Sequence, residues 1–245
     1  GDIARQYLIE KAEGVEWSVE SIERPGKSIA VNSALGLIDT DFFVMMDADA
    51  ILQSSALMLL VRWFQNPDIG GVCGGLALPS GTPGSSYRIR FNTIRVGESV
   101  MDSTPIFEGS ICAFRLLALG SGKITPHINA DDSQLAMLVR RNGYRAIMDP
   151  ELFFTEKPQA INRQRKRGVR RSQGLVRALF ANRDLISSKG KYGSIHALAF
   201  HFYILMPWLL LLSLISLLSS ILLIASLTDN LGMDRFTASG AILLA

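Results

Sequence analysis

The sequence predicts an α/β fold that is followed by a membrane helix, and three observations support this prediction. Helix-like and strand-like segments alternate through the first part of the 245-residue chain, which favours helices layered on a largely parallel sheet. The apolar run Phe42–Met46 has the length of a strand that is buried on both faces. Near the other end, the 37 residues from Tyr192 to Thr228 contain no Asp, Glu, Lys or Arg.

The expected elements are placed by apolar periodicity and by the turn residues between them. Helices are expected at 3–12, at 27–37 after the turn Pro25-Gly26, from Ser54 to about 64, and at 133–141 before Asn142-Gly143. Strands are expected at 15–19, 42–46, 72–78, 111–114 and 145–148. The stretch 79–86, rich in Gly, Pro and Ser, predicts a mobile loop.

Charge is concentrated in one segment, which the net charge of +3 conceals. Residues 157–191 carry eleven Lys and Arg and a single acid, Asp184, which gives +10, while the other 210 residues sum to −7. The 48% hydrophobic content excludes a disordered chain, and two cysteines exclude a disulfide-rich scaffold. The basic segment suits anionic lipid headgroups or a pyrophosphate. Nucleic acid is not expected as a partner, because the segment lacks interleaved aromatic residues.

The uncharged stretch is long enough to cross a membrane, which takes roughly 20 apolar residues. The alternative is a buried helix of a large soluble core, but core helices of this length rarely lack a charge. Because Lys and Arg are enriched on the cytosolic side, the neighbouring basic segment predicts an integral membrane protein with a cytosolic soluble part. Residues 240–245 look like the start of a second apolar segment, so we expect the chain to be a piece of a longer protein.

The motif Asp47-Ala-Asp49 follows the expected strand 42–46, and ligands of α/β sheets bind beyond the ends of strands. Two such carboxylates suit Mg²⁺, which binds one or two carboxylates together with substrate phosphates. Taken alone, the motif also fits loop or helix-capping aspartates. The aspartate nucleophile of a phosphatase is a weaker interpretation, because Ile51 stands where that class expects Thr or Val.

Three further motifs carry groups that suit chemistry or phosphate binding. Asp131-Asp132 precedes the expected helix 133–141, and mutual repulsion suits one carboxylate to act as a general base, although a helix N-cap is the alternative. Gln164-Arg165-Lys166-Arg167 offers guanidinium groups to a diphosphate. Gly26-Lys27-Ser28 ends like a phosphate-binding loop, but Ser21 stands where the first glycine of that loop belongs, so we exclude it.

In their order along the chain, these motifs resemble the membrane-bound family 2 glycosyltransferases, the group of the cellulose and hyaluronan synthases. The resemblance spans about residues 1–227 and includes, besides the motifs above, Asn32 and Phe107-Glu-Gly-Ser110. It implies a Rossmann-like glycosyltransferase domain of type A. It also implies inverting transfer of a hexose from a nucleotide-diphosphate sugar to a lipid-linked or polysaccharide acceptor.

The resemblance further implies roles for individual residues. Asp132 would be the catalytic base, and Asp49 with Asp47 would bind Mg²⁺ or Mn²⁺. The donor would be bound by Lys27, Asp47, Gln164, Arg165 and Arg167, and the acceptor side would include Gly109, Ser110 and Asp131. Asp131 replaces the usual Glu of the family, and Gly168 replaces the Trp that stacks on the acceptor sugar in polymerising members. The family's first strand would precede Gly1.

The resemblance divides the chain into a catalytic domain at 1–160, a basic interfacial segment at 161–191, a transmembrane segment at 192–228, and a loop with the start of a possible second membrane segment at 229–245. Within the interfacial segment we expect a helix over 169–185 with apolar side chains toward lipid and arginines toward headgroups: Leu175, Val176, Leu179, Phe180 and Leu185, and Arg170, Arg171, Arg177 and Arg183.

The expected partners are the sugar donor, a lipid-linked or glycan acceptor, and membrane lipids. One alternative is a non-catalytic membrane-bound relative that only binds a nucleotide sugar or lipid. A metal-dependent phosphatase is a third hypothesis.

Overall fold

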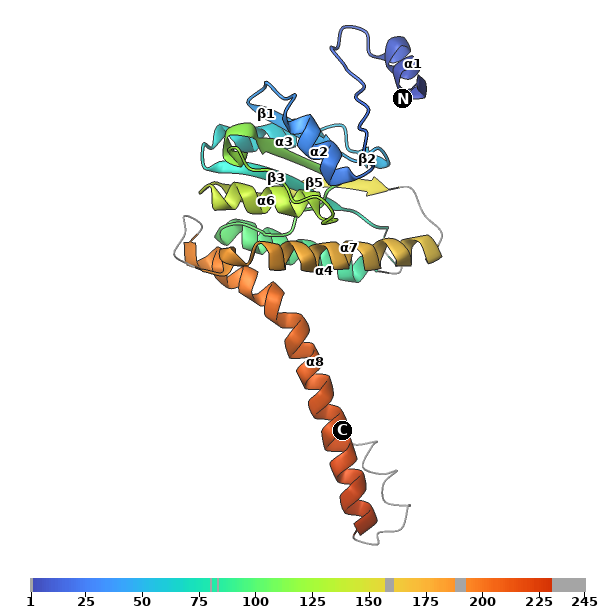
Figure 1. The fold of residues 1–245 in the computed structure, drawn as a ribbon, viewed down its shortest axis with the longest axis vertical. Helices are drawn as coiled ribbons and strands as arrows, with labels where there is room; N and C mark the ends of the chain where they lie inside the picture. The colour runs from blue at the N-terminus through green and yellow to red at the C-terminus, as the bar shows by residue number, and fades with distance from the viewer. Residues whose placement is uncertain (1, 80, 83, 157–160, 188–192, 231–245) are drawn as a thin grey trace. The chain divides into compact units, whose positions relative to one another are not determined.

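A five-stranded mixed sheet lies at the centre of the first of two compact units, residues 1–200 and 201–245 (Figure 1). A computed structural model describes residues 2–79, 81–82, 84–156, 161–187 and 193–230. The sheet order is β1-β4-β3-β5-β2, and β3 pairs with β5 in parallel, while the other three described pairs are antiparallel. The strands are β1 (Phe42–Met46), β2 (Ala50–Leu52), β3 (Ile69–Leu76), β4 (Ile111–Arg115) and β5 (Arg145–Glu156).

The predicted α/β class is confirmed, but the predicted largely parallel sheet is wrong. Alternating patterns indicate that helices connect strands, and they do not encode the direction in which a returning strand enters the sheet. Here β4 enters between β1 and β3 and runs against both. The strand expected at 15–19 is also absent from the described structure, and Val15 in that segment is exposed. The short strand β2 was not expected, because three residues carry too little periodicity.

The helices enclose the sheet from both faces. One apolar cluster contains Cys112 and Phe114 of β4, and the other contains Ile111 and Ala113 of the same strand, so alternate residues of β4 enter opposite layers. Helices α4, α6 and α7 lie on one side of the sheet in Figure 1, and α3 contributes Leu60 to the opposite cluster. The helices of this unit are α1 (Asp2–Lys11), α2 (Lys27–Leu35), α3 (Ala56–Arg62), α4 (Ser85–Met101), α5 (Leu116–Leu119), α6 (Asp131–Arg141) and α7 (Ile161–Ala181).

Strand β1 lies at the edge of the sheet, so the expectation of a strand buried on both faces is wrong for this segment. Val44 and Met46 are exposed, whereas Phe43 and Met45 pack against the cluster that contains Phe114. On the face of Val44 and Met46, Phe42 alone is covered, by stacking on Phe64 of the other cluster, so a run of consecutive apolar residues is compatible with an edge strand whose second face is only partly covered. This edge position keeps the residues that follow Met46 accessible.

Helix α4 was not expected, because its inward face is polar. Ser85, Arg95 and Ser99 are buried, and the Arg95 guanidinium donates to Glu108 at 3.1 Å and stacks over the Phe91 ring. The outward face exposes apolar side chains instead: Tyr87, Ile94, Val100 and Met101. A helix with this reversed polarity is not predicted when apolar residues are assumed to face the core. The helix also begins inside the stretch 79–86, which was expected to be a loop throughout.

Helix α7 begins earlier than the helix expected at 169–185 and ends at Ala181. Leu179 and Leu185 are buried within the first unit, so the expectation that they face lipid is wrong, whereas Val176 and Phe180 are exposed. Gly174 explains how closely α7 packs, because a Cβ at this position would overlap the backbone carbonyl of Asn129. A short 3₁₀ helix, Arg183–Ile186, follows α7.

Helix α8 (Gly193–Asn230) continues from the first unit into the second. Ala197 and Phe200, in its first turns, are buried in the first unit. Its segment from Ala199 to Thr228 is long and apolar enough to cross a membrane by length and composition. The apolar side chains of this segment within the second unit, such as Leu214 and Ile221, are exposed. The possible second membrane segment at 240–245 lies outside the described residues.

Candidate active site

The first part of the candidate site forms where β1 ends. Because Met46 is paired with Ile111, Asp47 and Ser110 are the next residues beyond this pair, and the Asp47 N–H donates to the Ser110 carbonyl at 3.2 Å. Lys27 begins helix α2, and its Nζ lies 2.6 Å from Asp47 Oδ1. Asp47 raises the pKa of Lys27 by hydrogen bonding and charge, against the opposing effect of burial, so Lys27 stays cationic.

The second part brings helix α7 to the same end of the sheet, where both β1 and β5 terminate. Arg167 Nη2 lies 3.2 Å from Asp49 Oδ2, and its Nη1 lies 3.2 Å from Glu156 Oε2. Glu156 ends β5 and also accepts a hydrogen bond from Ser110 Oγ at 3.0 Å, and Ser110 in turn lies beside Asp47. Side chains from four separate segments of the chain therefore meet at one cluster of charges.

The third part is the carboxylate of Asp132 at the start of α6. A Cβ on Gly109 would come within 3.0 Å of Asp132 Oδ2, so the glycine leaves space for this carboxylate. Burial raises the pKa of Asp132 to about 7, with Glu108 and Asp131 adding to the rise and the Ser133 N–H and Lys27 opposing it. A carboxylate that titrates near neutral pH is well suited to accept a proton.

Asp131 lies in a different environment from its neighbour. It is buried, and Ser28 of α2 donates a hydrogen bond to its carboxylate, so the pair connects α2 to α6. The Ser28 hydroxyl oxygen also lies 3.1 Å from the Ile128 carbonyl oxygen, which is the alternative acceptor for its single proton. Contact between Asp131 and an acceptor, which the resemblance implied, would require this buried connection to open.

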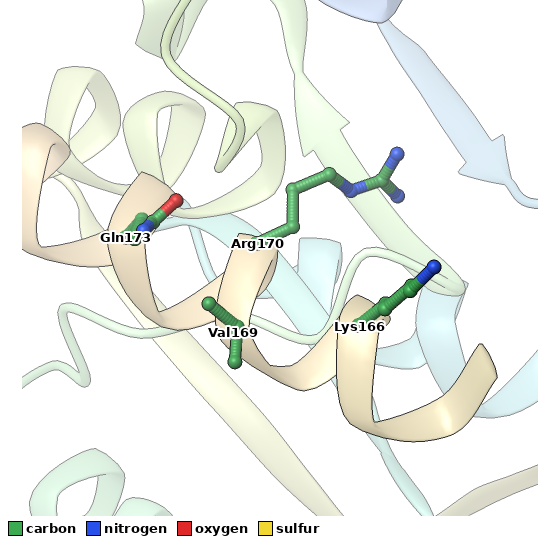
Figure 2. Close-up of a pocket in the computed structure, with 4 residues that line it drawn as sticks. All are labelled: Lys166, Val169, Arg170 and Gln173. Carbon is green, nitrogen blue, oxygen red and sulfur yellow. The ribbon is translucent and has the colours of Figure 1, made fainter. Parts of the chain in front are cut away.

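The remaining basic residues of the expected site lie on α7. Gln164 and Arg165 belong to this helix, but their side chains lie outside the described part of the structure. Lys166 and Arg170 project from the same side of α7 in Figure 2, where they line a shallow hollow of about 340 Å³ with Val169 and Gln173. The described part of α7 thus has one basic face at the hollow and a second, through Arg167, at the carboxylates.

Sequence reasoning missed two carboxylates and misplaced one arginine. Glu156 had no motif of its own, and its only signal is that it directly precedes the basic segment. Arg171 was expected at lipid headgroups, but its Nη2 lies 3.3 Å from Glu156 Oε1. Glu108 was named only as part of a motif, and it pairs with Arg88 and Arg95 of the unexpected helix α4.

The chemistry of these side chains fits a divalent cation that is bound together with a phosphate ligand. Within the described ranges, no three His, Cys, Asp or Glu side chains form a cluster that could hold an ion alone. Asp47 and Asp49 offer two carboxylates, and a hard cation such as Mg²⁺ completes such a set with phosphate oxygens and water. Lys27 and Arg167 now neutralise these carboxylates and carry the charge that a diphosphate requires.

The mixed sheet, its helix layers and the paired aspartates after β1 define a glycosyltransferase domain of type A. A family model described as glycosyl transferase family group 2 matches residues 42–233, and the chain belongs to this family. The resemblance seen in the sequence is therefore confirmed for the family, whereas the narrower likeness to cellulose and hyaluronan synthases is untested. No curated protein sequence matched the chain.

Among solved structures, the chain is similar to the mannosyltransferase PcManGT from Pyrobaculum calidifontis in complex with GDP-Man and Mn²⁺. The TM-score is 0.71 and the identity 28%, and the match covers 99% of this chain and 66% of that protein. Glucosyl-3-phosphoglycerate synthase from Mycobacterium tuberculosis, solved with Mn²⁺, UDP and glucosyl-3-phosphoglycerate, matches at 17% identity and a TM-score of 0.46. That match covers 66% of this chain and 56% of the synthase. The chain thus spans less than two thirds of the length of these proteins.

Proposed function

We propose that this chain is the catalytic part of a metal-dependent glycosyltransferase, which transfers a hexose with inversion from a nucleotide-diphosphate sugar to a lipid-linked or glycan acceptor. The observation that carries the proposal is the convergence of four side chains at the end of the sheet where β1 terminates, with Asp132 on helix α6: Asp47, Asp49, Lys27 and Arg167. The charges of both Asp47 and Asp132 act to raise the pKa of Lys27, which supports a base site beside the diphosphate site.

In the proposed reaction, Asp132 accepts the proton of the acceptor hydroxyl as that oxygen attacks the anomeric carbon. The bond from this carbon to the diphosphate breaks, and negative charge accumulates on the departing nucleotide. Lys27, which pairs with Asp47, and Arg167, which pairs with Asp49, neutralise this charge. When bound at Asp49 and Asp47, Mg²⁺ or Mn²⁺ supplies Lewis-acid stabilisation of the same diphosphate.

The membrane part of the proposal rests on α8 and on the surface of the first unit. The segment Ala199–Thr228 would anchor the protein, with the basic residues before it retaining the catalytic unit on the cytosolic side. Exposed Val169, Val176 and Phe180 on α7 lie on the same helix as the exposed base Arg170. Apolar side chains mixed with bases are typical of a surface that contacts anionic lipid, which would favour a lipid-linked acceptor.

The test is nucleotide release by the full-length protein in detergent or nanodiscs. GDP-mannose is the first donor to assay, because the similar mannosyltransferase binds it, and UDP-sugars follow, each with Mg²⁺ or Mn²⁺. Metal-dependent nucleotide release that is lost in both Asp49→Asn and Asp132→Asn supports the proposal. Donor binding without turnover on any acceptor would instead favour the non-catalytic relative, and phosphate release from simple esters would favour the phosphatase.

A further inference from the structure

Glu156 connects three side chains of the proposed site. Its Oε1 accepts from Ser110 Oγ at 3.0 Å and lies 3.3 Å from Arg171 Nη2, while its Oε2 lies 3.2 Å from Arg167 Nη1. The Glu156 side chain is 14% exposed, whereas those of Arg167 and Arg171 are 25% and 41% exposed, so the carboxylate is shielded while the arginines stay partly open to water. Charge-assisted hydrogen bonds of this kind are stronger than neutral ones, particularly where water is excluded.

The two arginines are four residues apart and therefore lie on the same face of α7. Because both meet Glu156, the last residue of β5, this carboxylate fixes the inner basic face of the helix against the C-terminal end of that strand. The charges of Glu156, Glu108 and Asp132 all act to raise the pKa of Arg171, against the opposing effect of burial. Glu156 thus keeps the guanidinium groups of Arg167 and Arg171 at the proposed site.

Arg167 divides its guanidinium between two carboxylates. Nη1 meets Glu156 and Nη2 meets Asp49, and the planar group presents these donors in a fixed fork. A divalent cation that binds Asp49 competes with Nη2, because two cations on one carboxylate repel each other. If Nη1 stays paired with Glu156, Arg167 remains beside the site after its ion pair with Asp49 has opened.

We propose that Glu156 is a positioning residue that keeps Arg167 at the diphosphate site and limits its competition with the metal for Asp49. Without Glu156, both ends of the guanidinium are free to pair with Asp49, which would make the metal harder to bind. This inference rests on the proposed function, since it requires that a divalent cation binds Asp49. It adds a role for a residue that had no expected part in the site.

Glu156 could also favour metal binding directly through its negative charge, and this explanation predicts a different effect of its replacement. A nearby negative charge attracts a divalent cation whether or not Arg167 is present, so loss of the charge alone would weaken binding to the same extent in any background. If Glu156 acts through Arg167, its effect must instead disappear when Arg167 is replaced. A double-mutant cycle separates the two explanations.

The experiment is a titration of the full-length protein with Mn²⁺ alone, with free Mn²⁺ followed by electron paramagnetic resonance. We expect Glu156→Gln to weaken Asp49-dependent binding about fivefold and Arg167→Gln to strengthen it, because a competing cation is removed. The double variant should bind within about twofold of Arg167→Gln. Glu151→Gln is the matched control, because Glu151 is on the same strand but 64% exposed and paired with Arg62; it should bind like the wild type.

A second variant, Glu156→Asp, separates the positioning role from the effect of the charge alone. Glu156→Asp keeps the negative charge but shortens its reach, so the positioning role predicts weakened binding, whereas the charge effect predicts binding close to the wild type. Equal weakening by Glu156→Gln with and without Arg167, or no weakening at all, would overturn the inference while Asp49-dependent binding still supported the proposed function. Mn²⁺ binding that is unchanged in Asp49→Asn would overturn both.

Discussion

Replacement of Asp132 by Asn tests whether a buried carboxylate that titrates near neutral pH is the base of this site. The folded protein raises the pKa of Asp132 from 3.8 to about 7, chiefly through burial. The folded state therefore binds its proton more tightly than the unfolded state does. Stability is highest at low pH and falls as the pH rises from about 4 to about 7, where the folded protein must carry the charge.

The size of this effect follows from the shift. Each unit of pKa corresponds to about 1.4 kcal/mol, so the full cost of the ionised Asp132 is at most about 4 kcal/mol. Asp132 is not fully buried as a residue, so we expect about 2 kcal/mol. Because Asn carries no charge, Asp132→Asn should raise the melting temperature by about 4–8 °C at pH 8.5, and by less than half as much at pH 5.

The assay combines thermal melting of the detergent-solubilised protein at the two pH values with turnover. Wild-type turnover should rise with pH and level off above about 7, and Asp132→Asn should lower it about 10²–10⁴-fold. Asp68→Asn, at an exposed aspartate before β3, is the control and should change neither quantity. An equal melting shift at both pH values, or retained turnover in Asp132→Asn, would refute the assignment of Asp132 as a desolvated base.

Three further predictions concern packing, the donor and the metal. Gly174→Ala should destabilise the fold by about 1–3 kcal/mol, because its Cβ would overlap the Asn129 carbonyl. Gly168→Ala, in open space on the same helix, is the control and should be neutral or stabilising. Equal melting temperatures of the two variants would contradict this prediction. Lys27→Met should raise the donor KM at least about tenfold through loss of a charge-assisted contact, and an unchanged KM would place the diphosphate elsewhere. Chelation should stop nucleotide release and added Mn²⁺ should restore it; activity that persists in chelator would exclude the metal.

The sequence predicted the site best where charged residues occur in a short motif beside a predictable strand or helix. Asp47 and Asp49 follow a strand that could be predicted from a short apolar run, and the order of the motifs indicated the family that the family model later confirmed. Arg167 could be predicted as a site residue from its motif, and the structure brings it to Asp49 across 118 positions of sequence. These residues are recognisable because each motif joins a local element to a charged side chain.

The rest of the site depends on pairings that no local pattern encodes. The inward face of α4 can be polar because Arg95 pairs there with Glu108. Hydrophobic periodicity within the helix does not predict a partner that lies outside it. Glu156 ends a strand of twelve residues of which four were expected, so its place beside Ser110 depends on the sheet register. The direction of β4 was missed for the same reason, since strand pairing is a property of distant segments.

The segregation of charge now has a structural explanation in the described residues. The acidic body and the basic segment are joined through ion pairs at the proposed site, where Arg167 and Arg171 meet Glu156 and Arg167 also meets Asp49. An incoming metal–diphosphate complex carries both kinds of charge, so its cation can replace Arg167 at Asp49 while its phosphates attract the released guanidinium. Such an exchange keeps these partly exposed charges compensated, because each pair that opens is replaced by another. Donor binding should therefore be coupled to the ion pair between Arg167 and Asp49, and loss of Glu156 should weaken this coupling.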